Sequence, residues 1–158
     1  MTVEEPGQQR RGRRIAMTAD ERAEFLAGQR TCRVATAGPE GPHATPLWFC
    51  WHGGSLWLYS LTRSRRWADL RSDPRIGAVI DDGTGFLELR GVEITGTVTV
   101  VGETPRTGEP CEELVEVEAQ FAAKYSETAG MLYDGRHGWL KVTPAKIVSW
   151  DFRKIGAG

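Results

Sequence analysis

The chain has 158 residues, of which 40% are hydrophobic and 26% charged, and its formal net charge is −1. These values are typical of one globular domain with a sizeable core, and they argue against a general nucleic-acid-binding protein. No apolar run approaches the length of a membrane span and no signal-peptide core is present, so we expect a cytoplasmic protein without membrane contact.

The first 17 residues have the composition of a disordered basic tail. Their four arginines lie among Gly, Gln and Pro, with almost nothing apolar to bury. Such a segment is predicted to stay disordered, so the folded domain should cover residues 18–158. A basic tail is also a weak indication of nucleic-acid contact, and we expect no such partner.

A helix and a strand begin the folded part. Thr18 and Glu21 form a capping box, which predicts a helix up to about residue 27. A short strand over 32–36 follows, and then turn chemistry over 38–42.

The next strand, over 43–51, is unusual because both of its faces are largely apolar. We therefore expect it to be covered on both sides. Pro46 within it donates no ladder hydrogen bond and usually marks an edge or a bulge. An edge strand of this kind needs cover from a ligand or a second subunit.

The stretch from residue 55 to residue 81 organises the chain. We expect a strand over 56–61, a helix that is N-capped by Ser64 and stopped at Asp73-Pro74, and a second strand over 75–80. A tight hairpin turn over 52–55 leads into the first of these strands.

Two hydroxyls and three arginines gather where that strand ends and the helix begins: Thr62, Arg63, Ser64, Arg65 and Arg66. Free backbone N–H groups, the positive end of the helix dipole and the guanidinium groups all favour a bound anion, and phosphate is the natural ligand. The alternative is a solvated loop with a basic face, because arginine runs at exposed helix starts are common.

The second half of the chain is mainly strand. Strands are expected over 86–92, 94–101, 139–142 and 147–152, and the longest helix over 110–125. That helix has one apolar stripe, with Glu118 and other glutamates facing outward. Seven or eight strands without strand–helix alternation indicate a mainly β fold, an antiparallel sheet closed into a small barrel with flanking helices.

The three cysteines are odd in number and widely spaced, without a CxxC pair. The three histidines also lack ligand spacing. We therefore expect neither a disulfide framework nor a metal site.

Four motifs carry a resemblance to a known family: CRVAT and GPHATPLWF over 32–49, LWLYSLTRSRRWADLRSDPRIGAVID over 56–81, LRGVEITGTVTVVGE over 89–103 and VTPAKIVSWDF over 142–152. Through them the chain resembles the flavin-binding split barrels related to pyridoxamine 5′-phosphate oxidase, above all their actinobacterial branch of FMN- and F420-dependent proteins. The resemblance implies a six-stranded antiparallel split β-barrel of the FMN-binding type, and a homodimer with two cofactor sites at the subunit interface.

The resemblance also implies where the cofactor binds. The phosphate of FMN, or of the deazaflavin F420, would lie on residues 62–66, and the ring system along residues 45–48. The implied cofactor-binding residues are Thr45, Pro46, Leu47, Trp48, Ser60, Thr62, Arg63, Ser64, Arg65, Arg66, Trp67, Trp139 and Lys141. The last two would reach the cofactor of the partner subunit.

The chain departs from the family pattern at Arg66 and Trp67, where relatives often have lysine and a small residue. Arginine binds phosphate bidentately, so it can replace the lysine. Trp67 leaves the choice between FMN and F420 open.

A flavin or deazaflavin supplies hydride or electron transfer itself, so no catalytic triad is required. His43, before the ring-binding strand, is a candidate proton donor to substrate, and the alternative is an exposed turn histidine. Trp48 either stacks on the ring or packs in the core. The resemblance implies an oxidoreductase acting on a small organic molecule, and the alternative is a non-catalytic flavin- or haem-binding carrier or sensor with the same fold.

Overall fold

The computed structural model describes residues 6–125, 127 and 130–157. Its strands are β1 Cys32–Gly38, β2 Gly41–Leu47, β3 Phe49–His52, β4 Ser55–Leu61, β5 Arg75–Asp82, β6 Arg90–Val101 and β7 His137–Asp151. Its α-helices are α1 Ala19–Gly28, α2 Arg65–Ser72 and α3 Glu112–Lys124, and single 3₁₀ turns lie at Arg13–Ile15, Phe86–Glu88 and Phe152–Lys154.

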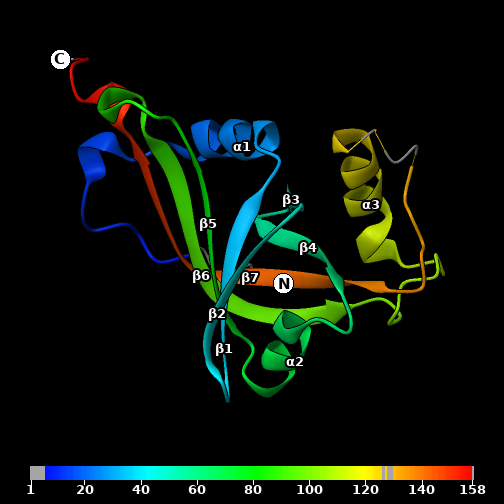
Figure 1. The fold of residues 1–158 in the computed structure, drawn as a ribbon. Helices are drawn as coiled ribbons and strands as arrows, with labels where there is room; N and C mark the ends of the chain where they lie inside the picture. Colours follow the sequence, from blue (N-terminus) through cyan, green and yellow to red (C-terminus); the bar gives the residue numbers. More distant parts are fainter. Residues whose placement is uncertain (1–5, 126, 128–129, 158) are drawn as a thin grey trace.

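The strands form one antiparallel sheet in the order β2-β1-β5-β6-β7-β4-β3. The sheet curls into a half-barrel, with α1 and α2 at opposite ends and α3 beside β3 and β4 (Figure 1). The prediction of a mainly β, split-barrel fold is confirmed, with seven strands in place of the six expected. None of the described helices is both long and apolar enough to cross a membrane.

The helix starts follow their local signals. Thr18 Oγ1 accepts a hydrogen bond from the Glu21 amide while the Glu21 carboxylate accepts one from the Thr18 amide, which is the expected capping box. Ser64 Oγ accepts from the Trp67 amide at 3.2 Å and so caps α2. The helix ends before Pro74, as the sequence predicts.

The strand expected over 43–51 is in fact two strands that are separated at Trp48. β2 pairs with β1 and β3 pairs with β4, so the two pieces form the opposite edges of the sheet. The expectation that both faces of this strand are covered is therefore wrong for β2 within one chain. Its alternate residues are half-buried on one face and largely exposed on the other. Pro46 does lie on an edge strand, where its missing N–H costs no ladder hydrogen bond.

β6 and β7 each replace two expected strands, and the segment before β6 is a 3₁₀ turn instead of a strand. They pair with each other along most of their length, with a register shift between Thr95 and Gly96. Gly96 lies opposite Pro144, and a Cβ on this glycine would sit 2.1 Å from the Thr143 carbonyl oxygen. Because Gly96 has no side chain, the strands can approach closely here. β7 therefore continues past Pro144 with an irregularity in its pairing and does not end there.

Two hydrophobic cores lie against the sheet. The first contains residues of α1, α2 and the strands between them, including Leu26, Phe49 and Trp67. The second lies under α3 and contains Phe121 and Trp139. The outward position expected for Glu118 is wrong, because this carboxylate is buried against Arg106 of the preceding loop.

Residues 6–17 lie along β7, which differs from the disorder expected for them. The Gly7 amide donates to the Ala145 carbonyl, and the Gln9 side chain exchanges two hydrogen bonds with the Ser149 backbone. The Met17 amide donates to Ser149 Oγ at 2.9 Å, and the Met17 side chain is buried. Hydrogen bonds to one strand thus replace the apolar burial that the sequence lacks. Residues 1–5 lie outside the described part.

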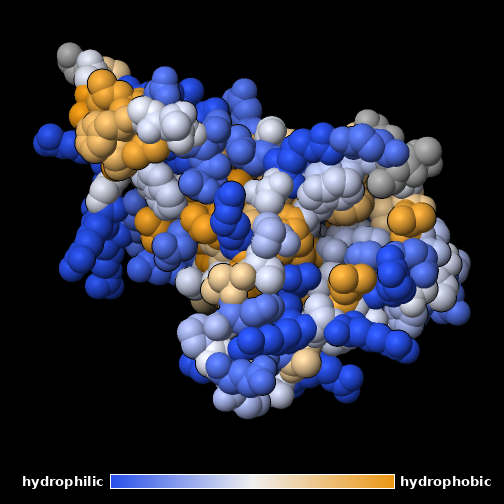
Figure 2. All heavy atoms as spheres, viewed as in Figure 1, coloured by the Kyte–Doolittle hydropathy of each residue, from blue (hydrophilic) through white to orange (hydrophobic). Residues whose placement is uncertain are grey.

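Exposed apolar side chains gather at the corner formed by the β5–β6 connection and the C-terminal 3₁₀ turn (Figure 2). Phe86, Leu87 and Ile155 are exposed there, and the Phe86 ring packs edge-on against Phe152 at 5.1 Å. This corner lies at the other end of β5 from α2, so it is separate from the arginine-rich segment.

Candidate functional site

Arg66 lies at the centre of the candidate site. It is the second residue of α2, and its side chain turns back between β2 and β4. Its Nε donates to Ser60 Oγ at 3.1 Å and its Nη1 donates to Thr45 Oγ1 at 2.5 Å. Only 7% of the residue is exposed. Three segments far apart in the sequence therefore meet at one guanidinium group.

This guanidinium has no carboxylate partner among the described residues. Its contacts are two neutral hydroxyls, and burial lowers its pKa from the usual range of arginine. A buried cation without a counter-ion is costly. The site is therefore suited to an anion that would supply the missing negative charge.

The start of α2 adds backbone donors to the cluster. Ser64 takes up the Trp67 amide through its hydroxyl and the Ala68 amide through its carbonyl. The described hydrogen bonds leave the amides of Arg65 and Arg66 without an acceptor. These two N–H groups and the helix dipole favour an anion at the same end of the helix.

Thr62 and Arg63 flank this helix start in different ways. The Thr62 amide and hydroxyl both donate to the Arg136 carbonyl, at 2.9 and 3.1 Å, which ties the turn to the segment before β7. Arg63 is exposed, and no described hydrogen bond or ion pair involves its side chain. Of the two, Arg63 is therefore the residue with a free side chain for an external anion.

Arg65 differs from Arg66 because carboxylates face it. Its Nε lies 3.8 Å from both Glu40 and Asp69, and its Nη2 donates to the Gly41 carbonyl at 3.4 Å. Arg65 thus spans from α2 to the β1–β2 turn and holds the helix against this hairpin.

The sequence analysis missed Asp69 and its partners in β1. Asp69 is buried and accepts a hydrogen bond from Thr36 Oγ1 at 3.0 Å. A Cβ on Gly38 would lie 2.0 Å from Asp69 Oδ1, so only glycine permits this approach. The four-residue spacing from Arg65 to Asp69 was the available signal.

Trp67 packs in the first core, so its side chain does not line the candidate anion site around Arg66. Its indole lies against the backbone of Gly138, where a Cβ would sit 2.9 Å from the ring atom Cη2. The large residue at this position is accommodated by a glycine on β7.

The β2 residues divide between its two faces. His43, Thr45 and Leu47 are half-buried on the face that carries Arg66, while Pro46 and Trp48 are more exposed on the other side. His43 Nδ1 is buried and has no hydrogen-bond partner among the described residues. The face of β2 nearest Arg66 thus offers one threonine, one leucine and one imidazole.

Trp48 is neither free nor buried. It is 38% exposed, and its ring stacks on Tyr125 with centroids 4.2 Å apart and an interplanar angle of 7°. The contact joins the break between β2 and β3 to the end of α3.

Trp139 and Lys141 lie on the other face of the sheet, beside α3. Trp139 is fully buried in the second core against Tyr59 and Phe121. Lys141 Nζ lies 3.4 Å from Glu113. The structure therefore does not bring either residue to Arg66 within one chain.

A second polar pair near α3 also escaped the sequence analysis. His137 Nδ1 lies 2.7 Å from Asp134 Oδ2, and the imidazole stacks on Tyr59 with centroids 5.0 Å apart. Beyond the three-residue spacing of Asp134 and His137, no sequence signal indicated this pair. No group of three or more metal-ligating side chains occurs in the described residues.

Comparison with known proteins agrees with this fold. The family profile described as pyridoxamine 5′-phosphate oxidase matches residues 18–151. The chain therefore belongs to the pyridoxamine 5′-phosphate oxidase-like family of split barrels. None of the curated proteins that were compared with the chain matches it.

Three solved structures illustrate the range of the fold. The conserved hypothetical protein Rv2991 from Mycobacterium tuberculosis is 30% identical, with a TM-score of 0.77 over 95% of this chain and 93% of that one. An FAD-binding protein from Mesorhizobium loti is 15% identical, with a TM-score of 0.66 over 85% and 93%. The haem storage protein HutZ from Vibrio cholerae is 15% identical, with a TM-score of 0.65 over 83% and 94%. At 15% identity the last two similarities concern the fold alone.

Proposed function

We propose that the chain binds the phosphate of FMN at the start of α2 and acts as an oxidoreductase on a small organic molecule, with F420 as the alternative cofactor. The observation that carries this proposal is the buried Arg66 guanidinium, which is bound to Thr45 and Ser60 and has no carboxylate partner among the described residues. A phosphate fits this donor set, because it supplies the missing negative charge and accepts several N–H bonds.

The proposal gives each part of the site a role. The start of α2 would hold the phosphate through the side chains of Arg63 and Arg66 and the free amides of Arg65 and Arg66, with Ser60 orienting Arg66. Thr62 and Ser64 would shape this turn, because their hydroxyls already donate to carbonyls of the chain. The ring would lie along β2 at Thr45, Pro46, Leu47 and Trp48, and Trp67 would support the helix from below. The bound flavin supplies the hydride or electron transfer.

The imidazole of His43 is the candidate proton donor of this chain. Its buried Nδ1 has no partner among the described residues, and a hydrogen bond to a group of the substrate would satisfy this otherwise unpaired atom. It shares a face of β2 with Thr45, which binds Arg66.

A homodimer is part of the proposal. β2 is an edge strand whose outer face is largely exposed, and a second chain would cover it. Lys141 is partly exposed, so it is the member of the Trp139–Lys141 pair that a partner's cofactor could reach. Sedimentation equilibrium at micromolar concentration should give twice the mass of the chain. A monomer with tightly bound cofactor would contradict both the interface and the shared site.

A non-catalytic carrier or sensor of flavin or haem is the second candidate, because the haem storage protein shares this fold. Turnover separates the two. An oxidoreductase should pass electrons from reduced cofactor to an organic acceptor in many cycles, whereas a carrier should only bind and release. Absorption spectra after separate additions of FMN, F420 and haem identify the cofactor.

The substitution Arg66→Ala tests the phosphate site. It removes a charge-assisted hydrogen bond worth roughly 1.5–3 kcal/mol, so FMN or F420 should bind on the order of ten- to a hundredfold more weakly. Arg66→Lys should keep much of the affinity, because the positive charge remains. Titration followed by flavin fluorescence or absorption measures both variants.

Riboflavin is the control ligand, since it has the ring system and no phosphate. Its binding should change little in Arg66→Ala. Equal losses for riboflavin and FMN would mean that Arg66 contacts the ring or supports the fold. Unchanged binding of both would mean that the guanidinium does not hold the phosphate.

A further inference from the structure

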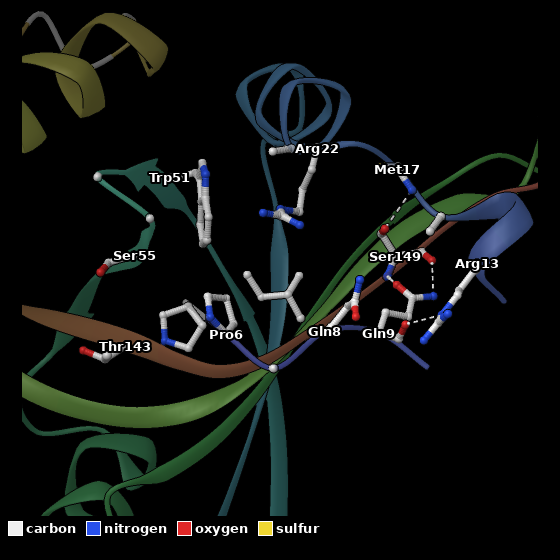
Figure 3. A pocket seen from close by; sticks show the side chains of 17 residues that line it. Pro6, Gln8, Gln9, Arg13, Met17, Arg22, Trp51, Ser55, Thr143 and Ser149 are labelled. Atoms are coloured by element: carbon white, nitrogen blue, oxygen red, sulfur yellow. Dashed lines mark hydrogen bonds between the residues drawn. The ribbon is translucent and has the colours of Figure 1, made fainter. Parts of the chain in front are cut away.

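A cavity of about 720 Å³ lies between the N-terminal segment, α1, the β3–β4 turn and β7 (Figure 3). Its size falls within the range of small-molecule sites. Thr45, Ser60 and Arg66 are not among the residues that line it. It is therefore separate from the proposed phosphate site.

The cavity has an apolar wall with one aromatic ring. Trp51 of β3 forms part of that wall, together with Met17, Ile147 and two prolines. In Figure 3 the Trp51 indole and the Arg22 side chain lie beside each other at the same side of the cavity. An indole face of this kind suits a flat apolar ligand.

The charges around the cavity are of one sign. Arg13 and Arg22 line it, and no aspartate or glutamate is among the described lining residues. Arg22 extends from α1 into the cavity (Figure 3), and its Nε is buried without a hydrogen-bond partner among the described residues. Burial also lowers the pKa of Arg22. A guanidinium that is partly exposed to the cavity and has one buried N–H group without an acceptor favours an anionic ligand.

The wall formed by the N-terminal segment is held in place by hydrogen bonds. Gln9 exchanges two bonds with the Ser149 backbone, and the Ser149 hydroxyl accepts from the Met17 amide. Arg13 Nε donates to the Gln9 carbonyl at 3.2 Å. This leaves Arg22 as the lining cation with an unpaired buried N–H group.

We propose that this cavity binds a small planar aromatic carboxylate, with Arg22 pairing with the carboxylate and Trp51 contacting the ring. A carboxylate can accept two parallel hydrogen bonds from a single guanidinium in a bidentate pair. The apolar wall then receives the rest of the molecule. A phosphate dianion fits less well, because it would bring more charge and more acceptors than this one arginine can satisfy. The inference does not rest on the proposed cofactor chemistry.

The probe for the test is 2-naphthoate, and isothermal titration calorimetry on the full chain measures its binding. We expect saturable binding to one site per chain and at least tenfold weaker binding to Arg22→Gln. The matched control is Arg71→Gln, an exposed helix arginine that does not line the cavity and should leave the affinity unchanged. The neutral analogue 2-naphthalenemethanol should bind the wild type and Arg22→Gln equally.

Further measurements separate this site from the fold and from the cofactor site. Thermal melting shows whether Arg22→Gln remains folded, and Trp51→Leu gives a second variant that should weaken naphthoate through the ring contact. Arg66→Ala should bind naphthoate like the wild type. Absence of saturable binding to the wild type, or equal affinity in Arg22→Gln, would overturn the proposal. Loss of binding in Arg66→Ala alone would place the carboxylate in the other site and would also overturn it.

Discussion

Arg66 and Arg106 are both nearly inaccessible, at 7% and 4% exposure, yet their surroundings differ. Arg106 donates from Nε to Glu118 at 2.5 Å, from Nη1 to Glu103, and to the Glu109 carbonyl at 2.7 Å. Arg66 meets only the hydroxyls of Thr45 and Ser60. One buried arginine is neutralised inside the chain, and the other is not.

The difference is visible in the direction of the pKa shifts. Burial alone lowers the pKa of Arg106, but its bonds to Glu103 and Glu118 outweigh this and raise it. The same bond to Arg106 lowers the pKa of Glu103 to about 2. For Arg66, burial dominates and the pKa falls. A buried arginine with carboxylates thus completes the fold, whereas one with hydroxyls alone is open to an external anion.

The largest expected effect on stability follows from removing Arg106 from its cluster with Glu103 and Glu118. Arg106→Met leaves the buried Glu118 carboxylate without its cation, which should lower the free energy of unfolding by about 3–5 kcal/mol. Urea denaturation measures this change. The double variant Arg106→Met with Glu118→Leu should recover part of the loss, because the buried carboxylate is then removed and only the more exposed Glu103 is left without its cation. A loss below about 1 kcal/mol in the single variant would show that the cluster does not carry the stability assigned to it.

Substitution of Arg66, which is bound only to Thr45 and Ser60, should affect stability differently. Arg66→Met removes an uncompensated buried charge, so the unfolding free energy without ligand should change by no more than about 1 kcal/mol. Ligand should then separate the variants. FMN at about a hundred times its Kd should stabilise the wild type by about 2.7 kcal/mol and Arg66→Met far less. A ligand-free loss as large as that of Arg106→Met would remove the contrast between the two arginines.

The sequence predicted the parts of this contrast that depend on neighbouring residues. Ser64 caps α2 because its acceptor reaches an amide three residues later, and Asp73-Pro74 stops the helix locally. The clustering of hydroxyls and arginines was also visible in the sequence. Which arginine is buried was not, because Arg66 is selected by the packing of α2 against β2 and β4.

The failures share one cause, which is contact between residues far apart in the sequence. Trp48 interrupts the expected strand, and its ring stacks on Tyr125. Two strands were expected over 139–142 and 147–152, but pairing of Pro144 with Gly96 keeps them in one continuous strand, β7. Glu118 follows the outward period of its helix until Arg106 in the preceding loop draws it inward. Helical periodicity and turn residues are local patterns, so they give no information on these distant partners.

Lys124 is a third cation to set beside Arg66 and Arg106, and its substitution should have the smallest effect on stability. Like Arg66, it has no carboxylate partner among the described residues. Its Nζ donates to the Leu26 carbonyl at 3.1 Å and lies 3.8 Å from the centre of the Phe49 ring. Burial lowers its pKa to about 8. Lysine can lose its proton within the accessible pH range and arginine cannot, so the cost of an unpaired cation becomes measurable here.

The sign of the effect follows from the lowered pKa. Below pH 8 the lysine is charged in both states, and the folded state bears the full cost of holding the charge. Between about pH 8 and 10.5 the unfolded chain binds more protons than the folded one, so this cost fades as pH rises. Lys124→Met should therefore exceed the wild type in stability by about 1 kcal/mol or less at pH 7, since the ammonium is partly solvated. Urea denaturation from pH 7 to 10 should show this advantage shrinking, because groups common to both proteins cancel in the difference. A difference that stays constant over the range would mean that Lys124 titrates as it does in the unfolded chain.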